Sequence, residues 1–120
     1  MGKIIVIVED TPDLLQNIAD FLRMEDFTIV PCVSGLDALK KLENVVPDLI
    51  ITDLWMPELD GFELIERIKS IELLRTVPIA IFSAKPYLEN NARSLSLGVD
   101  RYIKKPCTPE DLLNSIRDLL

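Results

Sequence analysis

Short apolar runs alternate with longer amphipathic segments along this chain of 120 residues, and that alternation limits the possible folds more than any other feature. The first run, residues 4–8, is uniformly apolar, as a strand covered on both faces should be. Strands that alternate with helices are typical of βα units on a parallel sheet. We therefore predict a single α/β domain, residues 1–120, with a doubly wound parallel sheet of five strands and five helices. The predicted strands are residues 4–8, 28–32, 49–52, 77–82 and 99–104.

The segments between these strands carry the signals of helices. Pro12 opens the first helix, and Thr108 precedes the last one as a capping residue. Pro31, inside the second strand, indicates a position at the edge of the sheet. The other helices are predicted over residues 35–44, with Leu36, Leu39 and Leu42 inward, over residues 62–71, and from near Pro86 to just before Gly98.

The composition narrows the chemistry and the partners. A net charge of −7 disfavours direct binding to nucleic acid or to an anionic membrane surface, since both need a basic footprint. No apolar stretch reaches the ~18 residues of a spanning helix and no signal-peptide pattern is present, so we expect a cytoplasmic protein. Cys32 and Cys107 are predicted to be free thiols. Histidine is absent, which excludes imidazole catalysis and leaves only oxygen ligands for a metal.

Polar side chains follow four of the predicted strands. Glu9 and Asp10 follow the first strand, Asp53 the third, Ser83 the fourth and Lys105 the fifth. Right-handed crossovers bring the carboxyl ends of parallel strands to one edge of the sheet, where such sheets bind ligands. Each residue alone is explained as well by a solvated charge or a turn serine. Their joint occurrence predicts one shared site.

The three carboxylates predict a metal site at this edge. Crowded carboxylates repel one another, which raises at least one pKa and weakens the fold. A divalent cation relieves that repulsion by binding several oxygens at once. Mg²⁺ accepts one or two protein carboxylates and leaves room for water and phosphate oxygens, so we expect Mg²⁺ at Glu9, Asp10 and Asp53.

The remaining residues suit phosphoryl transfer onto a carboxylate. Pro106 holds the backbone of Lys105 extended, and we expect the ammonium to pair with Asp53 at rest and with a phosphoryl oxygen after transfer. The hydroxyl of Ser83 is a second donor to that group. Asp53 then acts as the nucleophile while its neighbours neutralise charge. Lys104, which points to the other face, is expected to be solvated.

Over essentially its whole length the chain resembles the receiver domain of bacterial two-component response regulators. Each matching element is weak alone, but the ordered set at these spacings is specific. The resemblance implies a flavodoxin-like fold with strand order 2-1-3-4-5. The matching elements are Glu9-Asp10, Asp53, Met56-Pro57, Asp60-Gly61, Ser83-Ala84 and the run from Tyr102 to Pro106.

The resemblance also implies roles for individual residues. Asp53 is then the phosphoacceptor and, with Asp10, a direct Mg²⁺ ligand. Glu9 acts mainly through a water, and the backbone carbonyl of Trp55 completes the protein ligands. The remaining implied features are contacts of Lys105 and Ser83 with the phosphoryl group, Tyr102 as an inward-turning switch aromatic, and a cis Lys105–Pro106 bond.

The function implied by the resemblance is a phosphorelay signalling module, a regulatory domain that assists its own phosphorylation and dephosphorylation rather than an enzyme. A histidine kinase or a histidine phosphotransfer protein is the expected phosphoryl donor, and a downstream protein or fused output domain the expected target. Asp100 and Arg101 resemble charged pairs used for homodimers formed through the fourth helix, fifth strand and fifth helix, or else they form a solvated face.

Two other functions are open at this stage. An aspartate-nucleophile phosphatase of the haloacid dehalogenase type needs a second aspartate two residues after the nucleophile, where this chain has Trp55. A receiver-like binding module that is never phosphorylated is the other alternative. It is disfavoured because all the key side chains are present.

Overall fold

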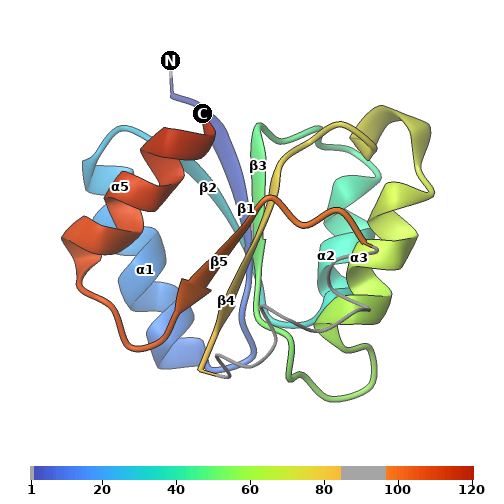
Figure 1. Cartoon of the computed structure of the whole chain (residues 1–120), viewed down its shortest axis with the longest axis horizontal. Helices are drawn as coiled ribbons and strands as arrows, with labels where there is room; N and C mark the ends of the chain where they lie inside the picture. Colours follow the sequence, from blue (N-terminus) through green and yellow to red (C-terminus); the bar gives the residue numbers. More distant parts are fainter. Residues whose placement is uncertain (1, 85–96) are drawn as a thin grey trace.

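The computed structural model describes residues 2–84 and 97–120. Within them the strands form one parallel sheet of order β2-β1-β3-β4-β5, which confirms the predicted fold (Figure 1). Pro31 is tolerated in β2 because β2 is an edge strand, where a missing N–H group costs no ladder bond on the open side. The strands are β1 (Ile4–Val8), β2 (Thr28–Cys32), β3 (Leu49–Thr52), β4 (Ile79–Ser83) and β5 (Arg101–Lys104).

Helices cover both faces of the sheet in a three-layer arrangement. Figure 1 shows α1 and α5 on one side and α2 and α3 on the other. Apolar side chains of β1, β3 and β4 therefore enter two separate core clusters, one against each helix pair. The helices are α1 (Pro12–Met24), α2 (Gly35–Leu42), α3 (Gly61–Lys69), the short 3₁₀ helix η1 (Glu72–Leu74) and α5 (Pro109–Leu119).

Side-chain caps fix where three of these helices begin. The Thr108 hydroxyl accepts a hydrogen bond from the backbone N–H of Asp111 at 3.0 Å, as the sequence predicted. Ser34 caps α2 and Asp60 caps α3 in the same way. The predicted helix between Pro86 and Gly98 lies outside the described residues. No helix of the described residues is long and apolar enough to cross a membrane.

One prediction about α2 is wrong. Leu36 is 48% exposed, and Leu39 is only partly buried. Leu42 is buried as predicted and Leu39 packs against the core, but the other buried positions of the helix are the small residues Gly35 and Ala38. A Cβ on Gly35 would lie 3.0 Å from the Leu59 carbonyl oxygen, so a glycine is favoured here because the loop after β3 packs closely on the start of this helix.

Strand and helix ends also differ from the sequence prediction by about two residues, the usual disagreement at element ends. β4 begins at Ile79 rather than residue 77, because Pro78 has no N–H group to donate to the ladder. Ser83 is the last residue of β4 rather than the residue after it. β5 begins at Arg101 rather than residue 99, and α3 ends at Lys69 rather than residue 71.

Gly61, the first residue of α3, allows this helix to approach the end of β3. Its N–H group donates to the carbonyl of Leu54 at 2.9 Å. A Cβ at this position would overlap the carbonyl oxygen of Asp53. The Asp60-Gly61 pair therefore combines a helix cap with the close packing that holds the backbone after Asp53 in place.

Candidate functional site

The predicted site residues meet at the carboxyl edge of the sheet. Backbone bonds continue just past the strands there: Asp53 N–H donates to Val8 at 3.1 Å, and Lys105 N–H donates to Ser83 at 2.9 Å. These bonds align the residues that follow β1 and β3, and those at the ends of β4 and β5. Segments as far as 96 residues apart in the sequence are thus brought into contact.

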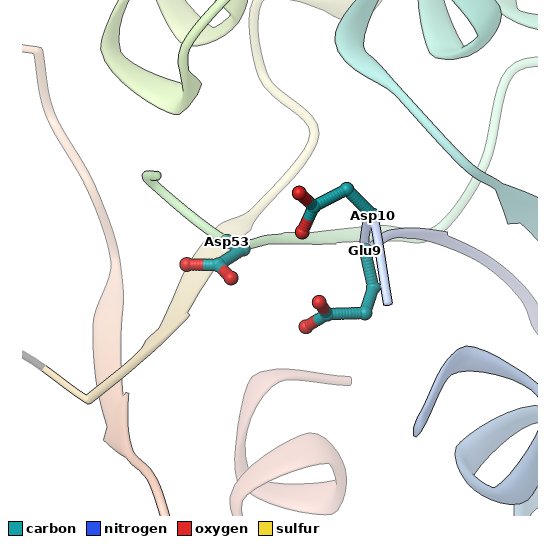
Figure 2. A group of neighbouring side chains, drawn as sticks. All are labelled: Glu9, Asp10 and Asp53. Carbon is teal, nitrogen blue, oxygen red and sulfur yellow. The ribbon is translucent and has the colours of Figure 1, made fainter. Parts of the chain in front are cut away.

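Three carboxylates converge at this edge. Glu9, Asp10 and Asp53 each offer an oxygen, and these oxygens all lie within 4.8 Å of one another. Figure 2 shows the three side chains around one shared space, with Glu9 and Asp10 directed to opposite sides of β1. Glu9 is only 2% exposed, so its charge is removed from water and needs partners inside the protein.

Lys105 supplies the opposing charge. Its Nζ donates to Oε1 of Glu9 at 2.6 Å and to Oδ2 of Asp53 at 3.1 Å. The expected Lys105–Asp53 pair is confirmed, whereas the shorter bond to Glu9 was missed. Burial acts to lower the pKa of Lys105, but the hydrogen bond to Glu9 and the charges of Asp53 and Glu9 outweigh it and raise the pKa above its usual value.

The backbone orients the carboxylate of Asp53. Oδ1 accepts from the N–H of Leu54 at 2.7 Å and, more weakly, from the N–H of Trp55 at 3.4 Å. Oδ2 is the oxygen that faces Lys105. Asp53 is therefore held on both sides, which fixes the direction in which it presents its oxygens.

The other residues singled out in the sequence lie on or just after β3, β4 and β5. Ser83 is buried at the end of β4, and Lys104 is exposed as predicted. The Tyr102 hydroxyl is buried without a hydrogen-bond partner among residues 2–84 and 97–120. Trp55, two residues after Asp53, is 48% exposed. The Lys105–Pro106 bond is cis, as the resemblance implied.

The donor set fits the predicted metal. It consists of carboxylate oxygens, two of them from side chains that are less than 15% exposed, and it contains neither sulfur nor imidazole. Hard oxygen ligands of this kind suit Mg²⁺ rather than zinc or copper. The residues present are therefore compatible with a magnesium ion between Glu9, Asp10 and Asp53.

The charged pair considered for dimerisation has partners within the chain. Oδ2 of Asp100 accepts from the N–H of Ile79 at 2.8 Å. Arg101 forms an ion pair with Asp118 of α5 at 3.0 Å. Both charges thus have a structural role in the single chain, and the homodimer stays a prediction.

A parallel sheet of this order, with acids and a lysine at its carboxyl edge, is the arrangement expected of a phosphorelay receiver domain. The family model described as "Response regulator receiver domain" matches residues 5–117, and the chain belongs to this family. Receiver domains are regulatory modules of phosphorelay signalling, so the phosphatase alternative is excluded.

Two relatives illustrate the range of proteins that contain such a domain. Hybrid signal transduction histidine kinase D of Dictyostelium discoideum is 32% identical over 98% of this chain, which corresponds to 8% of that protein. The probable transcriptional regulator ycf29 of Porphyra purpurea is 30% identical over 100% of this chain and 57% of that protein. The chain thus spans only part of these relatives.

Solved structures agree with the fold. The receiver domain of a signal transduction histidine kinase from Syntrophus aciditrophicus is 33% identical, with a TM-score of 0.89 over 99% of this chain and 90% of that chain. The receiver domain of sensor histidine kinase PA1611 from Pseudomonas aeruginosa is 27% identical, with a TM-score of 0.89 over 99% and 98% of the two chains. That second structure has a magnesium ion coordinated in its active site cleft.

Proposed function

We propose that this domain accepts a phosphoryl group on Asp53 in a Mg²⁺-dependent reaction and changes conformation to control a partner. The supporting observation is the setting of Asp53. One of its oxygens lies 3.1 Å from the Lys105 ammonium, the other is held by backbone N–H groups, and two further carboxylates lie within 4.8 Å. That combination of a fixed nucleophile, an adjacent cation and a candidate metal site is what phosphoryl transfer needs.

In the proposed transfer, a carboxylate oxygen of Asp53 forms a P–O bond while the P–N bond to the donor histidine breaks. The leaving imidazole nitrogen takes up a proton. The Leu54 N–H group keeps Asp53 oriented, the ammonium of Lys105 moves to one phosphoryl oxygen, and the Ser83 hydroxyl donates to another. The product carries about two negative charges where the carboxylate carried one, and it adds new acceptor oxygens at the same point, which can bias a conformational equilibrium.

We assign the Mg²⁺ ligands to the carboxylates of Asp10 and Asp53 and to the backbone carbonyl of Trp55. Glu9 completes the acidic surroundings. When bound, Mg²⁺ neutralises charge on the phosphoryl oxygens. The proximity of the three carboxylates supports this assignment.

The domain is proposed to extend over residues 1–120. Its phosphoryl donor is a phosphohistidine of a histidine kinase or of a histidine phosphotransfer protein, since this sequence has no histidine. A downstream protein or a fused output domain receives the signal, and a homodimer through the face that includes β5 and α5 is a further proposal. The domain assists its own phosphorylation and dephosphorylation without acting on a separate substrate.

The test is incubation with a small-molecule phosphodonor and Mg²⁺, followed by intact mass. The expected result is one added phosphoryl group that hydroxylamine removes, as it does from an acyl phosphate. Asp53→Asn should abolish the label, whereas Asp13→Asn, a change at an exposed aspartate of α1, should not. Equal labelling of Asp53→Asn and the parent would show that the acceptor is another residue.

A further inference from the structure

The Lys105 ammonium has a third partner besides the two carboxylates. Its Nζ lies over the ring of Phe82, 5.0 Å from the ring centroid. This distance is within the ~6 Å at which an ammonium is attracted to the negative face of an aromatic ring. Phe82 itself is 6% exposed, so water competes little for this contact.

The position of Phe82 in β4 explains the contact. Phe82 comes directly before Ser83, and alternation along the strand sends the two side chains to opposite faces of the sheet. Phe82 packs in the core cluster against α1 and α5. Its ring is thus rigidly held, and Lys105 extends over it from the end of the neighbouring strand β5.

Among the contacts of Lys105 with described residues, the ring differs in kind from the carboxylates. The bonds to Glu9 and Asp53 depend on the negative charge of these two acids. That charge also interacts with a cation or a phosphoryl group when one binds, so the hold of the acids on Lys105 then weakens. The attraction of the ring does not change with the charge of those acids. A lysine whose ammonium is already held over a fixed ring loses less conformational entropy on binding a phosphoryl oxygen than a lysine that is free to move.

From this geometry we infer that Phe82 is a positioning residue for the reaction: its ring face holds the Lys105 ammonium beside Asp53 while the lysine transfers its hydrogen bond from carboxylate to phosphoryl oxygen. This inference rests on the proposed phosphorylation of Asp53. It adds a residue that acts through Lys105 and does not itself touch the phosphoryl group.

The decisive experiment changes the electronics of the ring and keeps its shape. Phe82 is replaced, by amber suppression, with phenylalanines carrying increasing numbers of fluorine atoms, which weaken and then reverse the negative ring face. The rate of labelling by a small-molecule phosphodonor is measured at saturating Mg²⁺, with Mg²⁺ affinity and melting temperature measured on the same proteins. Phe82→Leu, which fills similar space without a ring, is a further variant, and the same fluorinated residues at Phe21, which packs against the same core cluster, are the control.

The expected result is a labelling rate that falls stepwise with fluorination, by about threefold to tenfold over the series. Phe82→Leu should fall to a similar level, while Mg²⁺ affinity and the Phe21 series stay constant. If Phe82 had only a structural role, the substitutions would lower the melting temperature, but the labelling rate would not fall stepwise with the number of fluorine atoms. A flat rate across the Phe82 series, in a parent protein that is labelled normally, would overturn the inference. Absence of labelling in the parent would instead overturn the proposed function.

Discussion

At the scale of single residues, Lys105 determines the electrostatic state of the site. Glu9 is almost completely buried, and such a carboxylate is tolerated only with a charged or hydrogen-bonding partner. In the part of the chain that the structure describes, its partners are the Lys105 ammonium at 2.6 Å and the N–H group of Thr11 at 3.2 Å. Lys105 therefore stabilises the fold as well as serving the proposed chemistry.

We expect Lys105→Ala to lower the free energy of unfolding in EDTA by about 1–3 kcal/mol, because it leaves a buried carboxylate without its charged partner. Lys104→Ala is the matched control. Lys104 is the neighbouring residue but is exposed, so its loss should change stability by less than about 0.5 kcal/mol. Urea denaturation measures both. Equal effects of the two substitutions would contradict the buried pair.

The two cysteines should differ sharply in reactivity. Cys32 is fully buried, and burial raises its pKa to about 12 against the opposing effect of Lys41. Cys107 is only partly buried, and burial together with Asp111 raises its pKa to a lesser extent. Since the thiolate reacts, a thiol reagent at pH 8 should modify one cysteine in the native protein and two after denaturation. Cys107→Ser should remove the reactive thiol, and two rapidly reacting thiols in the native parent would contradict this.

Residue-level chemistry was predictable only in part. Asp53 and Lys105 each directly follow a strand, so their meeting followed from the topology. The bond between Glu9 and Lys105 depends on side-chain rotamers across 96 residues of sequence, and no local pattern carries that information. The same holds for the ring of Phe82 beneath the ammonium.

At the scale of elements, two aspartates connect the starts of neighbouring strands through hydrogen bonds. Asp48 precedes β3 and exchanges two hydrogen bonds with Ile4 of β1, at 2.8 Å through its side chain and 2.7 Å through its backbone N–H. Asp100 precedes β5 and makes the same pair of bonds with Ile79 of β4, at 2.8 and 2.9 Å. An aspartate just before a strand was the available sequence signal, and it was missed.

Asp100→Ala should therefore destabilise the protein by about 1 kcal/mol, because the N–H group of the buried Ile79 loses its acceptor. Asp118→Ala is a suitable comparison. It removes an exposed ion pair with Arg101, and such pairs contribute about 0–1 kcal/mol. Denaturant midpoints at constant slope measure the difference, and a larger loss in Asp118→Ala would contradict this account.

Helices and strands were predictable wherever the periodicity of apolar residues was clear. They were less predictable where the close packing of neighbouring elements determines which residues are buried. The strand cores were correct because buried parallel strands are uniformly apolar. The inward face of α2 was only partly correct, because Leu36 was taken as buried along with Leu42, while the small residues Gly35 and Ala38 take buried positions. Small residues give no hydrophobic signal, yet they allow the close approach of Leu59.

At the scale of the whole molecule, the fold gathers negative charge at one edge of a chain that is already acidic. The net charge is −7, and three carboxylates of the site lie within 4.8 Å of one another. One lysine offsets part of this charge. The topology that produces the cluster was predictable from the order of strands and helices, because parallel strands share one carboxyl edge.

An ion that binds the folded site and not the unfolded chain stabilises the whole domain. Free Mg²⁺ at a hundredfold excess over its dissociation constant should add about 2.7 kcal/mol, which corresponds to a rise of about 10 °C in melting temperature. Potassium chloride at equal ionic strength should give a much smaller shift, since screening alone relieves only part of the repulsion between neighbouring carboxylates. Asp10→Asn should lose most of the response to Mg²⁺, while Asp13→Asn, exposed on α1, should retain it. If the melting temperature rises equally with both salts, or equally in both variants, the stabilisation comes from general charge screening and not from an ion bound by Asp10 and Asp53.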